Sequence, residues 1–236
     1  MLIGAHRGAY KDEPYVDENS LSAFKRAIDY KCDYIEFDVH KTLDNRFIVY
    51  HDTNINLNGS SFIIKDSPWT NTLENLSLPI TNEPLPLLED VISLCKGKIR
   101  MNVEIKDPLI GKEVVDFTLS LGATPSDFFV SSFHEQALKS IQISYKEIYT
   151  GFLFIGNYWS SKGSKAAVNL SCKSINPYYR FLNKWLVDFA LKHNLEIHTW
   201  TVNGEALKKV MQKEFVTSVL TNDVMTALSL RDQIFV

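Results

Sequence analysis

Short apolar runs alternate with longer amphipathic segments along most of this chain. Within residues 21–30, for example, Leu21, Phe24 and Ile28 recur at the spacing of one helix face. The apolar runs predict strands at Leu2–Ala5, Asp33–Val39, Phe47–Tyr50, Ile99–Ile105, Phe128–Phe133, Ile148–Leu153, Lys173–Ile175, Glu196–Thr201 and Ser218–Leu220. The amphipathic segments predict helices at Leu21–Tyr30, Pro86–Leu94, Lys112–Leu121, Glu135–Ile143, within Ser160–Leu170, Asn183–His193, Ala206–Lys213 and Asp223–Arg231.

Apart from Phe47–Tyr50, these elements form eight successive strand–helix units. Such alternation is typical of a parallel sheet, and eight units in 236 residues favour an α/β fold, the (β/α)8 TIM barrel. An open, doubly wound sheet is the alternative. No glycine-rich phosphate-binding motif follows the first strand, which argues against the dinucleotide-binding form of that alternative.

One interval, approximately residues 52–86, interrupts the alternation. It is rich in Asn, Ser, Thr and Pro, and no regular element is predicted in it. We interpret it as a small surface insertion between the second strand and the helix that follows. The chain shows no internal repeat and no low-complexity tract, so residues 1–236 are predicted to form a single barrel domain with that insertion.

Charge and cysteine content narrow the class of protein. With 25 basic and 28 acidic side chains the formal net charge is −3, which argues against a broad nucleic-acid-binding face. No apolar stretch approaches the ~20 residues of a membrane span, so no transmembrane segment is expected. Three cysteines without a CxxC pair argue against a disulfide framework. Because the N-terminus also lacks a signal-peptide pattern, we expect a cytoplasmic protein; its oligomeric state stays open.

Three carboxylates lie in predicted strands that are otherwise apolar. Glu36 and Asp38 are two residues apart and therefore point to one side of their strand, while Glu104 belongs to the third barrel strand. In a TIM barrel the reacting groups gather where the strands end, so the three are expected to converge. Buried carboxylates need neutralisation, and hard oxygen ligands favour Mg²⁺ or Ca²⁺. Salt bridges to neighbouring basic side chains are the alternative.

His6 and His51 each follow an apolar strand. Imidazole titrates near neutral pH, so two such groups could remove one proton and donate another during cleavage at phosphorus. Zinc ligation is the alternative, but the His-x-His motif common on the first strand of barrel metal hydrolases is absent here. Of the remaining histidines, His40 is assigned to the opposite strand face from the carboxylates, and structural roles are assigned to His134, His193 and His198.

Two basic side chains and one aromatic side chain follow the same strands. The Arg7 guanidinium and the Lys106 ammonium could bind the oxygens of a phosphodiester. Trp200 could form an aromatic wall against the apolar side of a polyol, or it could belong to the barrel core.

In their order along the chain, these motifs resemble those of the glycerophosphodiester phosphodiesterase family. The matching segments are His6-Arg7-Gly8 (HRG), Glu18-Asn19-Ser20 (ENT, with Ser for Thr), Glu36-Phe37-Asp38 (ExD), His51-Asp52 (HD), residues 85–90 (LPLLED), residues 102–106 (NxExK) and residues 200–203 (WTVN). Each motif is weak alone, but together they are specific.

The resemblance implies a (β/α)8 barrel and hydrolysis of a small-molecule glycerophosphodiester to glycerol 3-phosphate and an alcohol. It implies one divalent cation, Mg²⁺ or Ca²⁺. By the same resemblance, Glu36, Asp38 and Glu104 are metal ligands, His6 and His51 the acid/base pair, Arg7 and Lys106 phosphate contacts, and Glu18 and Trp200 further substrate-binding positions, with Asn19 in support.

The sequence departs from the family pattern in two places, and the first of them leaves the alcohol of the substrate open. The Arg-Thr pair that often follows HD is replaced by residues 53–59, and the last strand continues to Asn222-Asp223 instead of Asp-Pro. The alternative function is phospholipase D- or C-like or lysophospholipase D activity on lipid phosphodiesters. A non-catalytic phosphate-binding barrel is less favoured, because both histidines are present.

Overall fold

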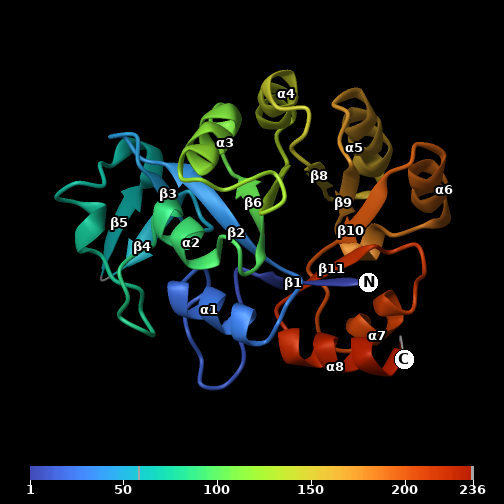
Figure 1. The fold of residues 1–236 in the computed structure, drawn as a ribbon, viewed down its shortest axis with the longest axis horizontal. Coiled ribbons are helices and arrows are strands. Elements are labelled where there is room, and N and C mark those ends of the chain that lie inside the picture. The colour runs from blue at the N-terminus through green and yellow to red at the C-terminus, as the bar shows by residue number, and fades with distance from the viewer. Residues whose placement is uncertain (58, 235–236) are drawn as a thin grey trace.

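The computed structural model describes residues 1–57 and 59–234, with the backbone alone for 157–160. Eight parallel strands in the described part of the chain pair edge to edge, and β1 pairs with both β2 and β11, so the sheet closes into a barrel (Figure 1). The TIM-barrel prediction is thereby confirmed. The barrel strands are β1 (Leu2–His6), β2 (Tyr34–Lys41), β6 (Arg100–Ile105), β7 (Phe128–Ser132), β8 (Thr150–Phe154), β9 (Ser174–Pro177), β10 (Glu196–Thr199) and β11 (Ser218–Thr221).

Helices surround the strands and cover their outer side (Figure 1). The first begins where the Ser20 hydroxyl accepts the backbone N–H of Ala23 at 3.0 Å, as in a typical N-cap. The helices are α1 (Leu21–Asp29), α2 (Leu88–Cys95), α3 (Gly111–Ser120), α4 (Glu135–Ser144), α5 (Asn157–Asn169), α6 (Lys184–Lys192), α7 (Ala206–Met211) and α8 (Val224–Ile234). All eight were predicted, with ends that differ by a few residues.

Strand β2 has apolar side chains on the side that faces the helices and carboxylates on the side that faces the barrel lumen. Ile35, Phe37 and Val39 face the helices and belong to the main apolar core. Because side chains alternate along a strand, Glu36 and Asp38 point into the barrel lumen. Both faces of the strand are therefore buried, and its carboxylates cannot be reached by solvent except through the barrel.

The insertion is more ordered than the sequence predicted. After β3 (Phe47–Val49), which pairs antiparallel with β2, the chain forms a hairpin of β4 (Asn54–Leu57) and β5 (Ser60–Ile63). Two short 3₁₀ turns follow at Ile64–Asp66 and Leu73–Asn75. Asn58, at the tip of this hairpin, lies outside the described residues.

The insertion has its own apolar core, which explains its order. This core also includes Ile48 of β3 and Leu87 just before α2. Its buried side chains come from short segments rather than one periodic run: Ile48, Ile55, Leu57, Ile64, Leu73, Leu78, Leu85 and Leu87. The Asp44 carboxylate ties this unit to the β2–β3 turn by accepting the backbone N–H groups of Trp69 and Thr70 at 2.8 and 3.0 Å.

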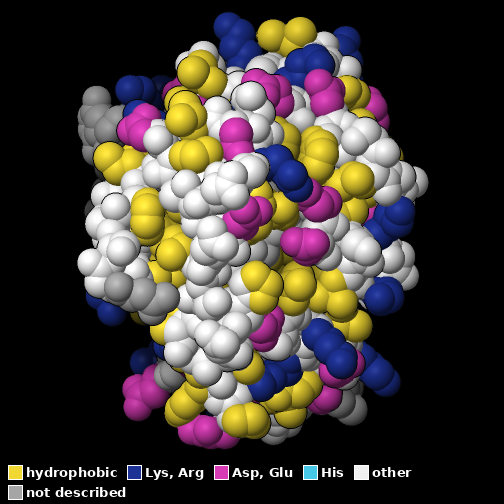
Figure 2. Space-filling view, turned by 90° about the vertical axis from the view of Figure 1, so that its left-hand side faces the viewer, with side chains coloured by type: hydrophobic (Ala, Val, Ile, Leu, Met, Phe, Trp, Pro, Cys, Tyr) yellow, Lys and Arg dark blue, Asp and Glu magenta, His cyan; other side chains and the backbone are white. Residues whose placement is uncertain are grey.

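No helix in the described part of the chain is long and apolar enough to cross a bilayer. The face shown in Figure 2 carries acidic and basic side chains interspersed among uncharged ones, and no continuous basic surface is visible on it. That distribution agrees with the slightly acidic net charge of −3.

Candidate active site

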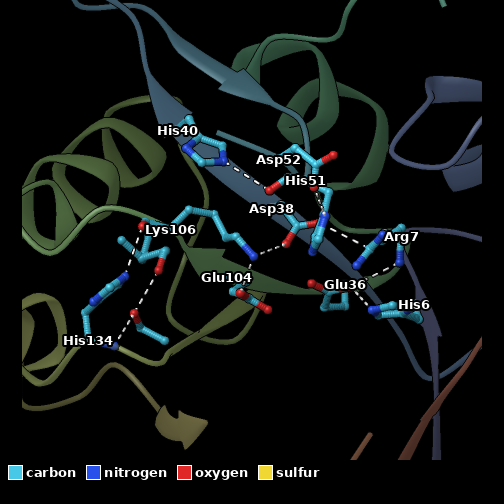
Figure 3. Close-up of polar contacts among 12 residues, drawn as sticks. His6, Arg7, Glu36, Asp38, His40, His51, Asp52, Glu104, Lys106 and His134 are labelled. Atoms are coloured by element: carbon cyan, nitrogen blue, oxygen red, sulfur yellow. Dashed lines mark hydrogen bonds and ion pairs between the residues drawn. The ribbon is translucent and has the colours of Figure 1, made fainter. Parts of the chain in front are cut away.

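The predicted site residues converge at the carboxyl ends of the barrel strands, an end referred to below as the mouth (Figure 3). The strand register accounts for the convergence. His6 of β1 is level with Glu36 of β2, and Asp38 is level with Glu104 of β6. Because all these strands are parallel, polar residues near their ends are brought to one place. His51 joins them from the segment after β3, which turns back beside β2.

The three carboxylates of Glu36, Asp38 and Glu104 form one cluster. One oxygen from each lies within 4.8 Å of the others. Glu36 and Asp38 are each 1% exposed, and Glu36 Oε1 has no hydrogen-bond partner among the described atoms. Burial, followed by repulsion from Asp38 and Glu104, raises the pKa of Glu36; burial and Asp38 raise the pKa of Glu104 to about 7. An all-oxygen, buried and mutually repelling set fits a hard divalent cation.

Two basic side chains compensate part of this charge. Lys106 Nζ lies 3.2 Å from Asp38 Oδ1 and 2.9 Å from Glu104 Oε1, and Arg7 Nε lies 3.5 Å from Asp38 Oδ2. Although burial alone would raise the pKa of Asp38, Lys106 and Arg7 lower it. The salt bridges considered as an alternative are therefore present, but they leave Glu36 without a Lys or Arg side-chain partner among the described residues. It accepts only the backbone N–H of Arg7, at 3.0 Å, and faces His6.

Both proposed acid/base histidines are held through Nδ1. In His6 this atom donates to Asn222 Oδ1 at 2.7 Å, and in His51 it donates to Asp52 Oδ1 at 2.6 Å. Each Nε2 is then left for other contacts, and both rings line the same cavity. His6 Nε2 lies 3.9 Å from Glu36 Oε2. Burial, followed by the charge of Arg7, lowers the pKa of His6 to about 4, so this ring is neutral at pH 7.

The assignment of His40 to the opposite strand face was wrong. Positions 36, 38 and 40 are two residues apart in one strand, so the side chain of His40 lies on the same side as the two carboxylates. Its Nε2 donates to the backbone oxygen of His51 at 3.2 Å and thereby fixes that segment (Figure 3). Strand parity in the sequence contained this signal. The contact of Asn222 with His6 was missed for another reason, since it joins residues 216 positions apart.

The remaining predicted residues also lie at the mouth. Glu18 Oε1 accepts a hydrogen bond from Arg7 Nη1 at 2.8 Å, and Asn19 Nδ2 donates a hydrogen bond to Asp38 Oδ2 at 2.9 Å. Trp200 lines the cavity and donates from Nε1 to the backbone oxygen of Asn176 at 2.8 Å. Its ring also packs against Phe133, with centroids 5.5 Å apart. Trp200 therefore serves both as packing and as cavity wall.

Comparison with known proteins identifies the family. Residues 6–226, which include every site residue above, match the model of the glycerophosphoryl diester phosphodiesterase family. The chain belongs to this family. A glycerophosphodiester phosphodiesterase of Caldanaerobacter subterraneus subsp. tengcongensis is 27% identical, over 97% of each chain. The predicted resemblance is thus confirmed, and the chain is an enzyme of the glycerophosphodiester phosphodiesterase class.

Solved structures of phosphodiesterases share the fold. A glycerophosphodiester phosphodiesterase from Parabacteroides distasonis superposes with a TM-score of 0.82 at 22% identity, over 98% of this chain and 97% of that one. A phosphodiesterase from Oleispira antarctica, solved with its product sn-glycerol-3-phosphate, gives a TM-score of 0.84 at 21% identity, with 98% and 97% covered. At 22% and 21% identity, the likeness to these two structures concerns the fold alone.

Proposed function

We propose that this chain, folded as one domain, hydrolyses small glycerophosphodiesters to glycerol 3-phosphate and an alcohol with the help of one divalent cation, Mg²⁺ or Ca²⁺. The observation that carries the proposal is the cluster of Glu36, Asp38 and Glu104, in which one oxygen of each lies within 4.8 Å of the others. Glu36 and Glu104 line the same cavity as the two imidazoles. The product bound to the Oleispira antarctica relative supports the choice of product.

The carboxylate cluster would hold the cation. Its oxygens suit Mg²⁺ or Ca²⁺, and the orphaned Glu36 Oε1 is a ligand atom without another partner among the described residues. When bound, the cation would stabilise charge on a phosphate oxygen and lower the pKa of a bound hydroxyl. Arg7 and Lys106, which already lie against Asp38, would bind and orient the phosphate.

His6 and His51 would transfer the protons. With Nδ1 engaged by Asn222 and Asp52, respectively, each ring would present Nε2 to the substrate. One Nε2 would take the proton of the nucleophile, and the other ring, protonated on both nitrogens, would protonate the departing alcohol oxygen from its Nε2. Water as nucleophile would give glycerol 3-phosphate directly, whereas the glycerol 2-hydroxyl would give a cyclic phosphate that water then opens. Trp200 would pack against the carbon side of the glycerol unit.

The test is a steady-state assay of glycerophosphocholine with glycerol 3-phosphate as the detected product. We expect turnover with Mg²⁺ or Ca²⁺, loss of turnover in EDTA, and recovery when the cation is returned. The isosteric Glu36→Gln variant should stay folded and remain inactive at any cation concentration. Turnover that EDTA and Glu36→Gln both leave intact would contradict the metal site, and no turnover of any glycerophosphodiester would contradict the function.

A second candidate, lysophospholipase D activity, is favoured by an apolar groove beside the mouth. The groove includes Phe133, Leu153, Phe154 and Ile155, and it shares Phe133 and Leu153 with the catalytic cavity. An acyl chain on the glycerol unit would lie there. Monomeric short-chain lysophosphatidylcholine should then have a higher kcat/KM than glycerophosphocholine; an equal or lower value rejects this candidate.

A further inference from the structure

A second cavity, of about 240 Å³, adjoins the catalytic cavity at His51, which lines both. Two parts of the chain form its walls. Asp17, Glu18 and Asn19 come from the loop between β1 and α1, while the other side belongs to Tyr50, Asp52 and the insertion. Of the lining residues, Asn56 and Leu57 belong to residues 53–59, where the sequence departs from the motif pattern described above.

The walls of the second cavity are acidic. Asp17, Glu18 and Asp52 line it, and no Lys or Arg belongs to its described lining. Glu18 is paired with Arg7 at 2.8 Å and Asp52 with His51 at 2.6 Å, whereas Asp17 has no basic partner among the described side chains. Burial, followed by the charges of Asp52, Glu18 and Asp17, raises the pKa of the Tyr50 hydroxyl, so all three carboxylates act on the same ring. The position of Asp17 is fixed, because it accepts the backbone N–H groups of Ile80 and Thr81 from the insertion.

A buried polar atom without a partner also lies in this wall. Asn19 is 2% exposed, and its Nδ2 is occupied by Asp38. Its Oδ1 has no hydrogen-bond partner among the described atoms. The backbone at Asn19 is held by a hydrogen bond to Arg7 O at 2.9 Å, so the side chain is presented by a fixed loop. An unsatisfied buried acceptor costs free energy, which the N–H of a primary ammonium such as that of ethanolamine would recover. The trimethylammonium of choline has no N–H, so the charge of the cavity and the Tyr50 ring would bind it instead.

The two cavities therefore differ in charge on either side of His51. Arg7 and Lys106 line the catalytic cavity and attract a phosphate, whereas the second cavity repels an anion and attracts a cation. A phosphodiester with a positively charged alcohol has this polarity. The Tyr50 ring adds an aromatic surface of the kind that binds ammonium groups.

We propose that the second cavity binds the alcohol part of the substrate and selects alcohols that carry an ammonium group, such as choline or ethanolamine. This inference rests on the proposed function. In the resulting orientation the phosphate lies over the carboxylate cluster, the alcohol extends past His51, and the glycerol unit lies toward Trp200.

Strand β4 offers a matched pair of variants. Asn54 and Asn56 are both exposed and two residues apart, but Asn56 lines the second cavity and Asn54 lines a different one. Asn56→Lys places a positive charge in the second cavity. We expect it to lower kcat/KM for glycerophosphocholine about 5- to 10-fold, mostly through KM, and to leave the neutral-alcohol diester glycerophosphoglycerol within 2-fold. Asn54→Lys should leave kcat/KM for both substrates within 2-fold of the wild-type values.

A binding measurement separates this inference from the proposed function. Choline and its neutral isostere 3,3-dimethylbutan-1-ol are titrated into the wild-type protein and into Asn56→Lys. Preferential binding of choline by wild type, weakened in Asn56→Lys, supports the subsite even if no diester is hydrolysed. Equal binding of the two alcohols, or equal kcat/KM for glycerophosphocholine and glycerophosphoglycerol in an active enzyme, overturns it and leaves the proposed function standing.

Discussion

The two ends of the barrel lumen both contain carboxylates, but these carboxylates have different surroundings. At the end opposite the mouth, the Glu196 carboxylate accepts the Tyr149 hydroxyl at 2.7 Å and lies 3.0 Å from His198 Nε2. Arg100 completes this end, 4.8 Å from the Phe129 ring centroid. The hydrogen bond from His198 lowers the pKa of Glu196, whereas burial raises the pKa values of Glu36 and Glu104 at the mouth.

This contrast separates a carboxylate that has hydrogen-bond partners within the protein from one that has an unpartnered oxygen. At the closed end the protein itself supplies hydrogen bonds to the anion. At the mouth the protein gathers like charges and leaves Glu36 Oε1 without a partner among the described residues. Such an arrangement is unfavourable for folding alone, and strained or unpaired polar groups of this kind are typical of functional sites.

The largest effect is expected at the mouth histidines. His6→Ala and His51→Ala should each lower kcat about 10²–10⁴-fold, because each removes one proton-transfer group. Thermal unfolding and circular dichroism should show that both variants fold. His193→Ala, an exposed histidine at the end of α6, is the matched control and should keep wild-type activity. Near-normal turnover by either mouth variant would refute the role of that histidine.

The carboxylates at the mouth should oppose folding when no cation is bound. The pKa of Glu104 is about 7 in the folded chain against 4.5 for a free side chain, so its ionisation costs stability as pH rises through 4.5–7. In EDTA at pH 7, Glu104→Gln should therefore be more stable than wild type by about 1–3 kcal/mol. Urea unfolding at pH 4.5 and 7 measures this; saturating Ca²⁺ or Mg²⁺ should reverse the order. Equal free energies of unfolding for wild type and Glu104→Gln at both pH values would contradict the proposed difference between the two ends of the lumen.

At the closed end the sign should be opposite. The pKa of Glu196 is lowered, so its stabilising contribution is present above its unfolded pKa and is lost as pH falls toward the folded one. Glu196→Gln should lower stability at pH 7 by about 1 kcal/mol, a modest value because the side chain is 48% exposed. The same urea titration provides the measurement, and kcat should not change. Stabilisation by Glu196→Gln would show that both ends behave alike.

The smallest effect concerns a carboxylate outside the lumen. Burial alone would raise the pKa of Asp44, but hydrogen bonds from Thr42, Trp69 and Thr70 lower it. Asp44→Ala should lower the free energy of unfolding by about 0.5–1 kcal/mol, and this loss should shrink at acidic pH. Asp66→Ala, which removes an exposed acid within the insertion, should cost less. Faster hydrogen exchange at the Trp69 and Thr70 amides in Asp44→Ala would show that the loss of stability arises at these hydrogen bonds. An unaltered exchange rate would argue that the Asp44 carboxylate does not hold this segment in place.

Most of the barrel could be predicted from the sequence, because each strand and each amphipathic helix is a local pattern. The register of parallel strands then brings Glu36, Asp38 and Glu104 together without further information. Strand parity could also have placed His40 on the correct side. The sequence contained that signal, and the prediction misapplied it.

The structure of the insertion could not be predicted in the same way. Ile55, Leu73 and Leu85 pack together although they come from separate short segments with no shared periodicity. The contact between His6 and Asn222 depends on closure of the barrel through β1 and β11. Both features arise from tertiary packing, which single-sequence patterns do not encode.

Cation binding tests the central claim most directly. Mg²⁺ and Ca²⁺ are titrated calorimetrically into EDTA-treated and desalted protein, with Asp66→Asn as a control for general loss of negative charge. We expect one ion per wild-type chain, the same for Asp66→Asn, and no saturable binding by Glu36→Gln. Absence of binding to the wild type, or equal binding by wild type and Glu36→Gln, would show that the three carboxylates at the mouth do not form a metal site.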